Sequence, residues 1–491
     1  MRRRRWSRFA ARTARMLLAP ALAALSLACA SSATWDRFDP DRLVPKAEAP
    51  STSPSPAVPW KPTANATAPA SQAKAPELPP WHGAGSTATL EQLIDVALQN
   101  NPTTRIAWLQ AREAEATLGS RRSAYYPELD LSGQVLRQKQ AAPGGRSVFE
   151  QTTYGPTFLL TYILFDFGGR ASQVEEARQN LITADLLHNA AIQNVVLQVE
   201  QAYFQYLNAK ALLDAQEATM RELRTNLSVA EGRHDAGVAT IADVLQARTA
   251  LSQGELNRET FEGAAETLRG SLAAALGYPP STRFEIGLLP AGVTTQAVED
   301  AVETLLTRAQ NERPDLAAAR AQALRARSRV NEVRAQALPS ISLNANLNRT
   351  YYGSSGSVPF INNWSASVLF KMPLFTGFRN TWDLREAKLE ADVANEQVTS
   401  TANQIALQVW TSYYALKTAS QRLKTSRDLL ASAVQSYDVA QGRYKEGVGG
   451  ILDLLTAQAA LESARAQEVQ SRADWFLAIA QLAHDTGTLG T

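Results

Sequence analysis

The segment RHDAGVATIADVLQA, residues 233–247, returns 210 residues later as RYKEGVGGILDLLTA, residues 443–457. Arg, Gly, Val, Asp, Leu and Ala recur at the same places in both segments. Repetition at a fixed interval indicates a chain assembled from copies of one structural unit. The same interval relates residues far outside these segments, namely Tyr203 with Tyr413 and Gly277 with Gly487. We therefore expect two structural repeats, at 89–277 and 302–487, joined by a linker at 278–301.

An uninterrupted long helix dominates each repeat. Residues 171–231 and 380–441 contain neither Gly nor Pro, and both ranges are rich in Ala, Leu, Gln, Glu and Arg. Apolar residues recur there at spacings of three and four, the pattern of a helix with one buried face. A helix of about 60 residues is about 90 Å long, because each residue adds 1.5 Å. No compact globular domain needs a helix of that length.

The shorter helices of a repeat match this length when they lie end to end. Residues 103–124 and 241–276 hold 58 residues together, which predicts a second rod of about 87 Å beside the first. Each repeat thus offers a helical pair suited to form one stave of a helical barrel. A cytoplasmic coiled coil is the alternative interpretation.

Strand-like runs lie between the helices. Apolar and polar residues alternate from 341 to 348, so that Ile341 and Leu343 fall on one face and Ser342 and Asn344 on the other. This alternation is typical of a wall with lipid on one side and water on the other. The alternative is a soluble antiparallel sheet with one buried face. The other predicted strands are 129–135, 158–165 and 364–370, with aromatic residues at their ends and loops at 139–153 and 352–362.

Four strands cannot close a barrel, and an open sheet edge in lipid leaves backbone groups without hydrogen-bond partners. Several chains must therefore close it together, and three chains would supply twelve strands around a water-filled lumen. The expected fold is an α+β membrane protein. It is a homotrimeric duct whose twelve-stranded transmembrane β-barrel, four strands per chain, is continuous with a long periplasmic α-helical barrel.

The N-terminal region predicts export and a lipid anchor. Residues 1–28 have the basic start and the apolar stretch of a signal peptide. Cys29, the only cysteine, follows directly and resembles the lipid-modified cysteine of a bacterial lipoprotein, although Ser26 stands where such proteins usually carry leucine. An incidental thiol is the alternative. Residues 29–85 include a long stretch rich in Pro, Ala, Ser and Thr that cannot bury enough apolar surface to fold, so we expect them to form a lipid-anchored tether.

The balance of charge gives no case for a nucleic-acid partner. The chain has 49 basic and 47 acidic side chains, but seven of the basic ones lie in the predicted signal peptide. The remainder carries 42 basic and 47 acidic side chains, a formal charge of −5. A nucleic-acid surface requires the opposite sign.

No motif of an enzyme or a metal site is evident. His82, His188, His234 and His484 are scattered, without the spacing of zinc ligands. Neither a nucleophile elbow nor a zinc-protease motif occurs. We therefore expect no enzymatic activity, no cofactor and no metal.

Residues 89–487 resemble the TolC-like outer membrane efflux family, and in particular its lipoprotein-type members. The family repeats a turn in which an aspartate follows a glycine by six residues and a leucine follows two residues later. This turn occurs here as Gly237, Asp243, Leu245 and as Gly447, Asp453, Leu455. Also family-like, after the second strand of each repeat, are Phe165, Gly168, Arg170 and Phe375, Gly377, Arg379.

The resemblance implies a duct that closes at these turns and docks there on an adaptor protein. Asp453 matches an aspartate that narrows the pore, and Tyr444 matches an aromatic residue that holds the closed state. Relatives carry an arginine and a second aspartate where this chain has Gly449 and Thr456, so the closed gate would be tethered more loosely. Asp243 is expected to cap the returning helix. The predicted adaptor-contacting residues are Gly237, Val238, Ala239, Thr240, Ile241, Asp243, Leu245, Gly447, Val448, Gly449, Gly450, Ile451 and Leu455.

The resemblance further implies a passive exit duct in the outer membrane of a Gram-negative bacterium. Substrates would reach it from an inner-membrane pump, driven by protons, through the periplasmic adaptor. Two alternatives remain open: the outer-membrane duct of a type I protein secretion system, and an exported, lipid-anchored coiled-coil scaffold.

Overall fold

The computed structural model describes residues 52–53, 55–61, 87–141, 148–287, 301–353 and 360–489. All of these residues belong to one compact unit of the chain. The predicted signal peptide, Cys29 and much of the predicted tether lie outside the described residues.

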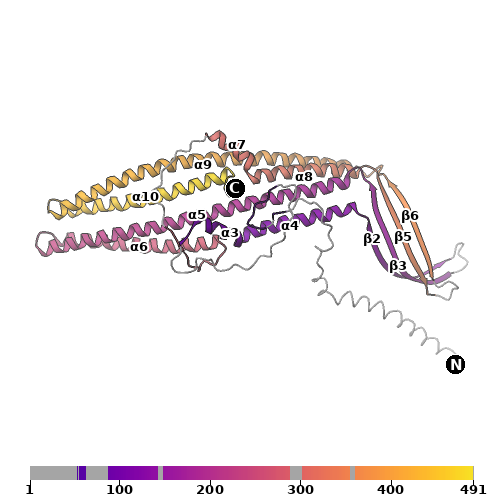
Figure 1. The fold of residues 1–491 in the computed structure, drawn as a ribbon, viewed down its shortest axis with the longest axis horizontal. Coiled ribbons are helices and arrows are strands. Elements are labelled where there is room, and N and C mark those ends of the chain that lie inside the picture. The colour runs from indigo at the N-terminus through magenta and orange to yellow at the C-terminus, as the bar shows by residue number, and fades with distance from the viewer. Residues whose placement is uncertain are drawn as a thin grey trace, which may run out of the picture. The chain divides into compact units, whose positions relative to one another are not determined.

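Eight α-helices of the described residues follow one order twice (Figure 1). The first set is α3 (Leu90–Asn100), α4 (Pro102–Arg122), α5 (Gly169–Asp235) and α6 (Ile241–Ala275). The second set is α7 (Val302–Glu312), α8 (Pro314–Gln336), α9 (Arg379–Lys445) and α10 (Ile451–Asp485). Both α5 and α9 have 67 residues, and both α6 and α10 have 35. The two long helices that the absence of Gly and Pro predicted are confirmed, each about 100 Å long.

Each long helix has two shorter helices packed along it. Helices α4 and α6 contact α5, and α8 and α10 contact α9, with α4 and α8 toward the sheet (Figure 1). The predicted pairing of a continuous rod with a composite one is therefore confirmed. Helix α5 also packs against α8 and α10, which joins the two halves of the chain. Among the described residues, no helix combines the length and the apolar character needed to cross a membrane.

A four-stranded antiparallel sheet lies at one end of the helices (Figure 1). Its order is β2 (Glu128–Ala141), β3 (Val148–Phe165), β5 (Ser340–Tyr352) and β6 (Phe360–Lys371). Leu131 pairs with Phe158, and Leu347 pairs with Trp364. These apolar side chains are exposed, and Trp364 is 78% accessible. Two smaller strands, β1 (Thr87–Ala88) and β4 (Glu285–Ile286), form a separate parallel pair beside the helices.

The strands are longer than the sequence predicted. Residues 139–141 and 148–153, predicted as loop, belong to β2 and β3, and residues 352 and 360–362 belong to β5 and β6. Residues 139–141 pair with residues 148–150 in the ladder, and Arg137 lies 3.5 Å from Glu150 across the strands. Backbone pairing continues beyond the apolar stretch because exposed polar side chains do not oppose it.

The buried core is distributed along the helices. One cluster joins α3, α5 and α6 around Leu207 and Leu272, and another joins α7, α9 and α10 around Val409 and Leu423. Between them the rings of Phe204 and Phe476 stack with centroids 4.9 Å apart. A core of this kind stabilises a rod through many local contacts.

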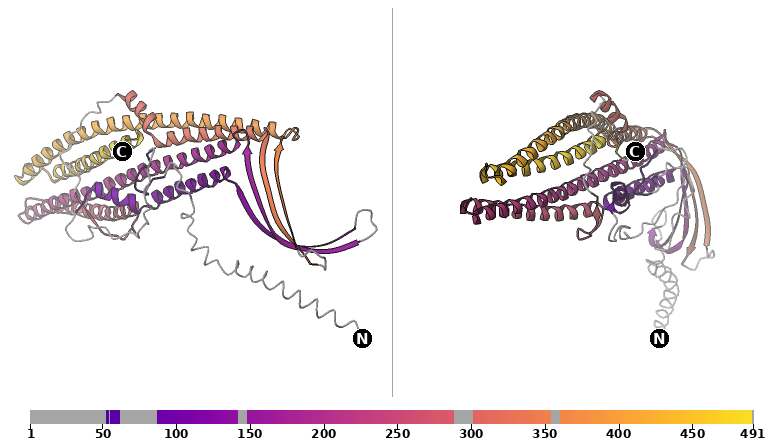
Figure 2. Two further views of the ribbon diagram at one scale, coloured as in Figure 1. Left: turned by 45° about the vertical axis from the view of Figure 1, so that its right-hand side comes forward. Right: turned by 60° about the vertical axis from the view of Figure 1, so that its left-hand side comes forward.

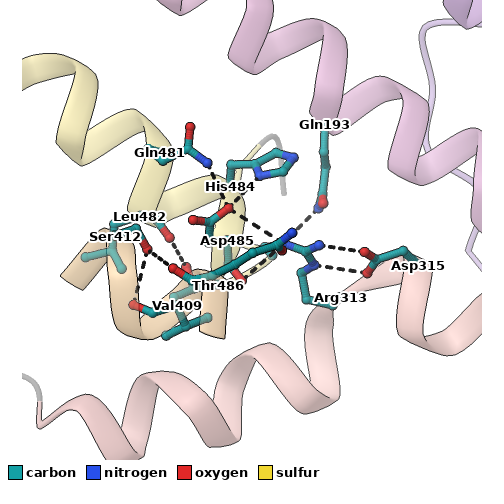
Figure 3. Close-up of polar contacts among 12 residues, drawn as sticks. Gln193, Arg313, Asp315, Val409, Ser412, Gln481, Leu482, His484, Asp485 and Thr486 are labelled. Atoms are coloured by element: carbon teal, nitrogen blue, oxygen red, sulfur yellow. Dashed lines mark hydrogen bonds and ion pairs between the residues drawn. The ribbon is translucent and has the colours of Figure 1, made fainter. Parts of the chain in front are cut away.

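A polar network holds the junction of α7, α8 and α10 (Figure 3). The buried Arg313 side chain places Nη2 2.5 Å from Asp315 Oδ2 and donates from Nη1 to the backbone oxygen of Asp485 at 3.4 Å. His484 lies between Asp485 and Asn194 of α5, at 3.0 and 2.9 Å. The corresponding junction of the first half is simpler, because there the Asn101 amide donates to the backbone oxygen of Ala275 at 3.0 Å.

Part of the predicted tether is docked. Residues 52–53 and 55–61, here called the docked segment, pack on α4 and α5. The Asn189 amide accepts from the backbone N–H of Trp60 at 2.6 Å and donates to its carbonyl at 2.7 Å. The Trp108 indole donates to Ser53 O, and His188 Nε2 donates to Pro56 O. The predicted tether thus includes a stretch that contacts Trp108, His188 and Asn189, and composition alone did not reveal these contacts.

Candidate functional site: the hairpin tips

Both helical hairpins turn at the same end of the unit, away from the sheet (Figures 1 and 2). Gly237 (φ +72°) and Gly447 (φ +79°) adopt the left-handed conformation that glycine tolerates best. After each glycine the next N–H returns to the last helical turn, from Val238 to Arg233 O and from Val448 to Arg443 O, both at 2.9 Å. This pattern ends a helix and reverses the chain. We call the two turns with their flanking residues the hairpin tips.

The two tips start their second helix differently. Thr240 Oγ1 accepts from the N–H of Asp243, and Asp243 Oδ2 accepts from the N–H of Thr240 at 3.1 Å. This is a capping box, so the predicted capping role of Asp243 is confirmed. Gly450 stands at the equivalent place in the second tip and has no side chain to cap the helix. Asp453 is exposed, and its carboxylate makes no hydrogen bond to the part of the chain that the structure describes.

A contact between Arg233 and Tyr444 joins the two tips within one chain. The guanidinium carbon lies 4.9 Å from the centre of the tyrosine ring, and Nη1 donates to the backbone oxygen of Tyr444 at 2.7 Å. Tyr444 is buried, and this burial raises the pKa of its phenol. Arg233 was not among the predicted site residues. Its recurrence as Arg443 was the one signal in the sequence.

A polar seam continues this contact up the hairpins. Glu222 of α5 lies 2.7 Å from the guanidinium of Arg465 and accepts from Gln458 at 2.9 Å. Asn226 and Tyr437 extend the seam toward the tips. Helix α5 is therefore tied to α9 and α10 by side-chain hydrogen bonds over several turns.

Most predicted contact residues are open to solvent, but Ile451 is not. The exposed members include Gly237, Val238, Thr240, Ile241, Leu245, Gly447, Val448 and Gly450, while Ala239, Asp243, Gly449 and Leu455 are half-buried. Ile451 is only 5% exposed and packs with Tyr437, Tyr444 and Leu454. The prediction that Ile451 contacts a partner is corrected, because its side chain fills the core between the tips. Ile241, its equivalent, is 57% exposed.

The histidines have separate surroundings. His188 lies under the docked segment, His234 in the first tip and His484 in the network of Figure 3; His82 lies outside the described residues. Within the described ranges, no group of three His, Cys, Asp or Glu side chains is placed to hold a metal ion.

Two stretches of the chain, residues 93–278 and 305–488, match the model of the family described as outer membrane efflux protein. The chain belongs to this family. The two stretches matched by the family model correspond to the two halves of the structure, which contain the same order of helices and strands.

Named relatives agree with this membership. Protein CyaE of Bordetella pertussis is 29% identical over 399 residues, which cover 80% of this chain and 82% of that protein. The toluene efflux pump outer membrane protein TtgC of Pseudomonas putida is 25% identical over 398 residues, which cover 78% and 80%. The structure of the outer-membrane channel OprN superposes with a TM-score of 0.74 at 20% identity, over 90% of this chain and 97% of that one. This last likeness concerns the fold.

Proposed function

We propose that this outer membrane efflux protein is the passive exit duct of a tripartite efflux system in a Gram-negative outer membrane. The observation that carries the proposal is the junction of an exposed apolar sheet with two helices that are each about 100 Å long. The sheet suits the membrane and the hairpins suit the periplasm. The duct transports and catalyses no reaction, and neither a cofactor nor a metal is required.

A closed ring of three chains completes the duct. In the described part of the sheet, β2 and β6 each have one neighbour, so both edges are open for pairing. Three copies bring twelve strands, enough for a barrel with a water-filled lumen. Helix α9 supports the same arrangement with a stripe of exposed apolar residues, Trp382, Leu389 and Val393. Exposed Ile106 and Leu109 of α4, at the opposite edge of the chain, offer a matching surface.

The hairpin tips form the gate and the adaptor site in this proposal. Three copies of Asp453 form a ring of carboxylates that favours cations at the narrowest point. Tyr444, held by Arg233, keeps the two hairpins of one chain together. The exposed apolar residues Val238, Ile241, Leu245 and Val448 offer the periplasmic adaptor a surface with few charges.

The remaining parts complete the assembly. Residues 1–28 serve as the signal peptide, Cys29 carries the lipid, and the tether connects it to two repeats at 89–277 and 302–487 through the linker at 278–301. TtgC is named as part of a toluene efflux pump, which supports an inner-membrane pump as the source of substrate, and we propose that protons drive it.

Fractionation tests this proposal. The protein should be found in the outer membrane and should migrate as a trimer that dissociates to a monomer on heating. Recovery as a soluble elongated dimer would contradict the duct and favour a coiled-coil scaffold.

A further inference from the structure

The Arg233–Tyr444 contact lies where the first-half tip of a chain meets its second-half tip. We call such a line of contact between two neighbouring tips a seam. The offset of 210 residues relates Arg233 to Arg443 and His234 to Tyr444. In a closed ring the halves alternate, so that every second seam lies between copies. At a seam between copies, Arg443 of one copy takes the place of Arg233, and His234 of the next copy takes the place of Tyr444. If the contact between copies has the same geometry as the contact within a chain, Arg443 of one copy lies against His234 of the next.

We propose that Arg443 packs on His234 of the neighbouring copy and that this contact is the acid-sensitive seam of the gate. The proposal rests on the ring of three chains proposed above. Acid would then open the tips between copies, while the two hairpins of each chain stay joined.

The single chain leaves both residues ready for this contact. The side chain of Arg443 is exposed and makes no hydrogen bond within the described ranges, whereas that of Arg233 is engaged. His234 is exposed, and its Nδ1 donates to Ala239 O at 3.1 Å. This hydrogen bond uses Nδ1 and leaves Nε2 without a partner among the described residues. A guanidinium stacks favourably on an uncharged aromatic ring.

The seam between copies lacks the ties of the seam within a chain. Glu222 and Arg465 form an ion pair at 2.7 Å within the chain, but their equivalents at the offset are Ser432 and Glu255. These residues cannot form an ion pair with each other. The ion pair that ties the two hairpins of one chain therefore has no counterpart in the seam between copies.

Protonation acts on one seam and not on the other. Histidine ordinarily gains its charge between about pH 8 and pH 5, and a protonated His234 would face the permanent charge of Arg443. Tyr444 remains a neutral phenol through this range, because a tyrosine ordinarily loses its proton at about pH 10 and burial raises the pKa of Tyr444 further. Like charges in contact repel, so acid weakens the seam between copies.

The other charged groups near His234 are largely committed. On α5 they are Glu231, Arg233 and Asp235, and on α6 they are Asp243 and Arg248; the neighbouring copy adds Lys445 and Glu446 beside Arg443. Glu231 pairs with Arg248 at 3.1 Å, and Asp243 closes the capping box. Asp235 and the Glu446 of the neighbouring copy have no such role, and Lys445 adds to the repulsion.

Thiol cross-linking tests the contact itself. In the intact protein, His234→Cys combined with Arg443→Cys should link neighbouring copies through a short bismaleimide, giving dimers and trimers on a denaturing gel. Each cysteine alone and the parent chain should give no such product. Arg233→Cys with Tyr444→Cys is the matched control, because its link stays inside one chain and leaves the mass of one chain.

The outcomes separate the inference from the proposed function. If a lysine-reactive cross-linker traps a trimer but the double cysteine variant gives only monomer, the contact is wrong and the ring stands. If both reagents give only monomer, the ring and the contact fall together.

The pH dependence of conductance tests the role of the contact. In planar bilayers the parent protein should conduct more at pH 5 than at pH 8, several-fold, and His234→Gln should abolish this difference. His484→Gln, far from the tips, should leave it in place. An unchanged pH response in His234→Gln would overturn the assignment.

Discussion

Asp185 of α5 is fully buried, and neither carboxylate oxygen has a hydrogen-bond partner among the described residues. Burial raises the pKa of this carboxyl to about 8, and the nearby charge of Glu115 adds to the effect. The folded protein therefore keeps Asp185 protonated at neutral pH. It lies one helical turn from His188 and Asn189, which hold the docked segment.

Asp185→Asn should reduce the pH dependence of stability. The unfolded chain loses this proton near pH 4 and the folded chain near pH 8, so the free energy of unfolding falls by up to about 1.4 kcal/mol per pH unit between them. The variant should match the parent at pH 4 and exceed it in melting temperature at pH 8. Asp214→Asn, at an exposed site of the same helix, is the control. An equal difference from the parent at both pH values would contradict the account.

Asp453→Ala should make the duct leakier to ions, because it removes the proposed ring of carboxylates. Asp243→Ala instead removes the hydrogen bond from Thr240 N–H to Asp243 Oδ2, which should cost about 1 kcal/mol of stability and change conductance little. Single-channel recording and thermal unfolding of both variants separate the two roles. Unchanged conductance in Asp453→Ala would remove its assignment to the gate.

At the scale of elements, the docked segment depends on Asn189. Asn189→Ala leaves the backbone N–H and C=O of Trp60 without these partners, and each lost hydrogen bond costs about 1 kcal/mol. Amide hydrogen exchange within residues 55–61 should therefore become faster, while exchange in α9 stays unchanged. Asn395→Ala, at an exposed position of α9, is the matched control. Equal protection of the docked segment in parent and Asn189→Ala would show that this amide does not hold it.

The sequence was informative about elements where its signal was periodic or repeated. The lack of Gly and Pro predicted α5 and α9, and the offset of 210 residues located both tips. It did not reveal the extent of the strands, because backbone pairing sets their ends. It also missed the docked segment and the burial of Ile451, since both depend on contacts between residues far apart in the chain. Ile241 and Ile451 occupy the same place in the two segments, and the difference in their exposure to solvent is visible only in the folded structure.

At the scale of the whole molecule, a single chain leaves several surfaces without a partner. Among the residues that the structure describes, its sheet has two open edges, its apolar strand face is exposed, and α9 carries an exposed apolar stripe. Three features of different chemistry thus favour a ring of copies. In such a ring, the 210-residue offset between the two halves predicts which residues of neighbouring copies meet at the gate.

Conductance of the purified protein in planar bilayers tests the central claim most directly. The protein, solubilised in mild detergent and added to one side, should insert as a trimer and give discrete, ion-conducting steps that heat dissociation of the trimer abolishes. A trimer that inserts without any conductance, or conductance equal before and after dissociation, would contradict the assignment of this protein as an exit duct.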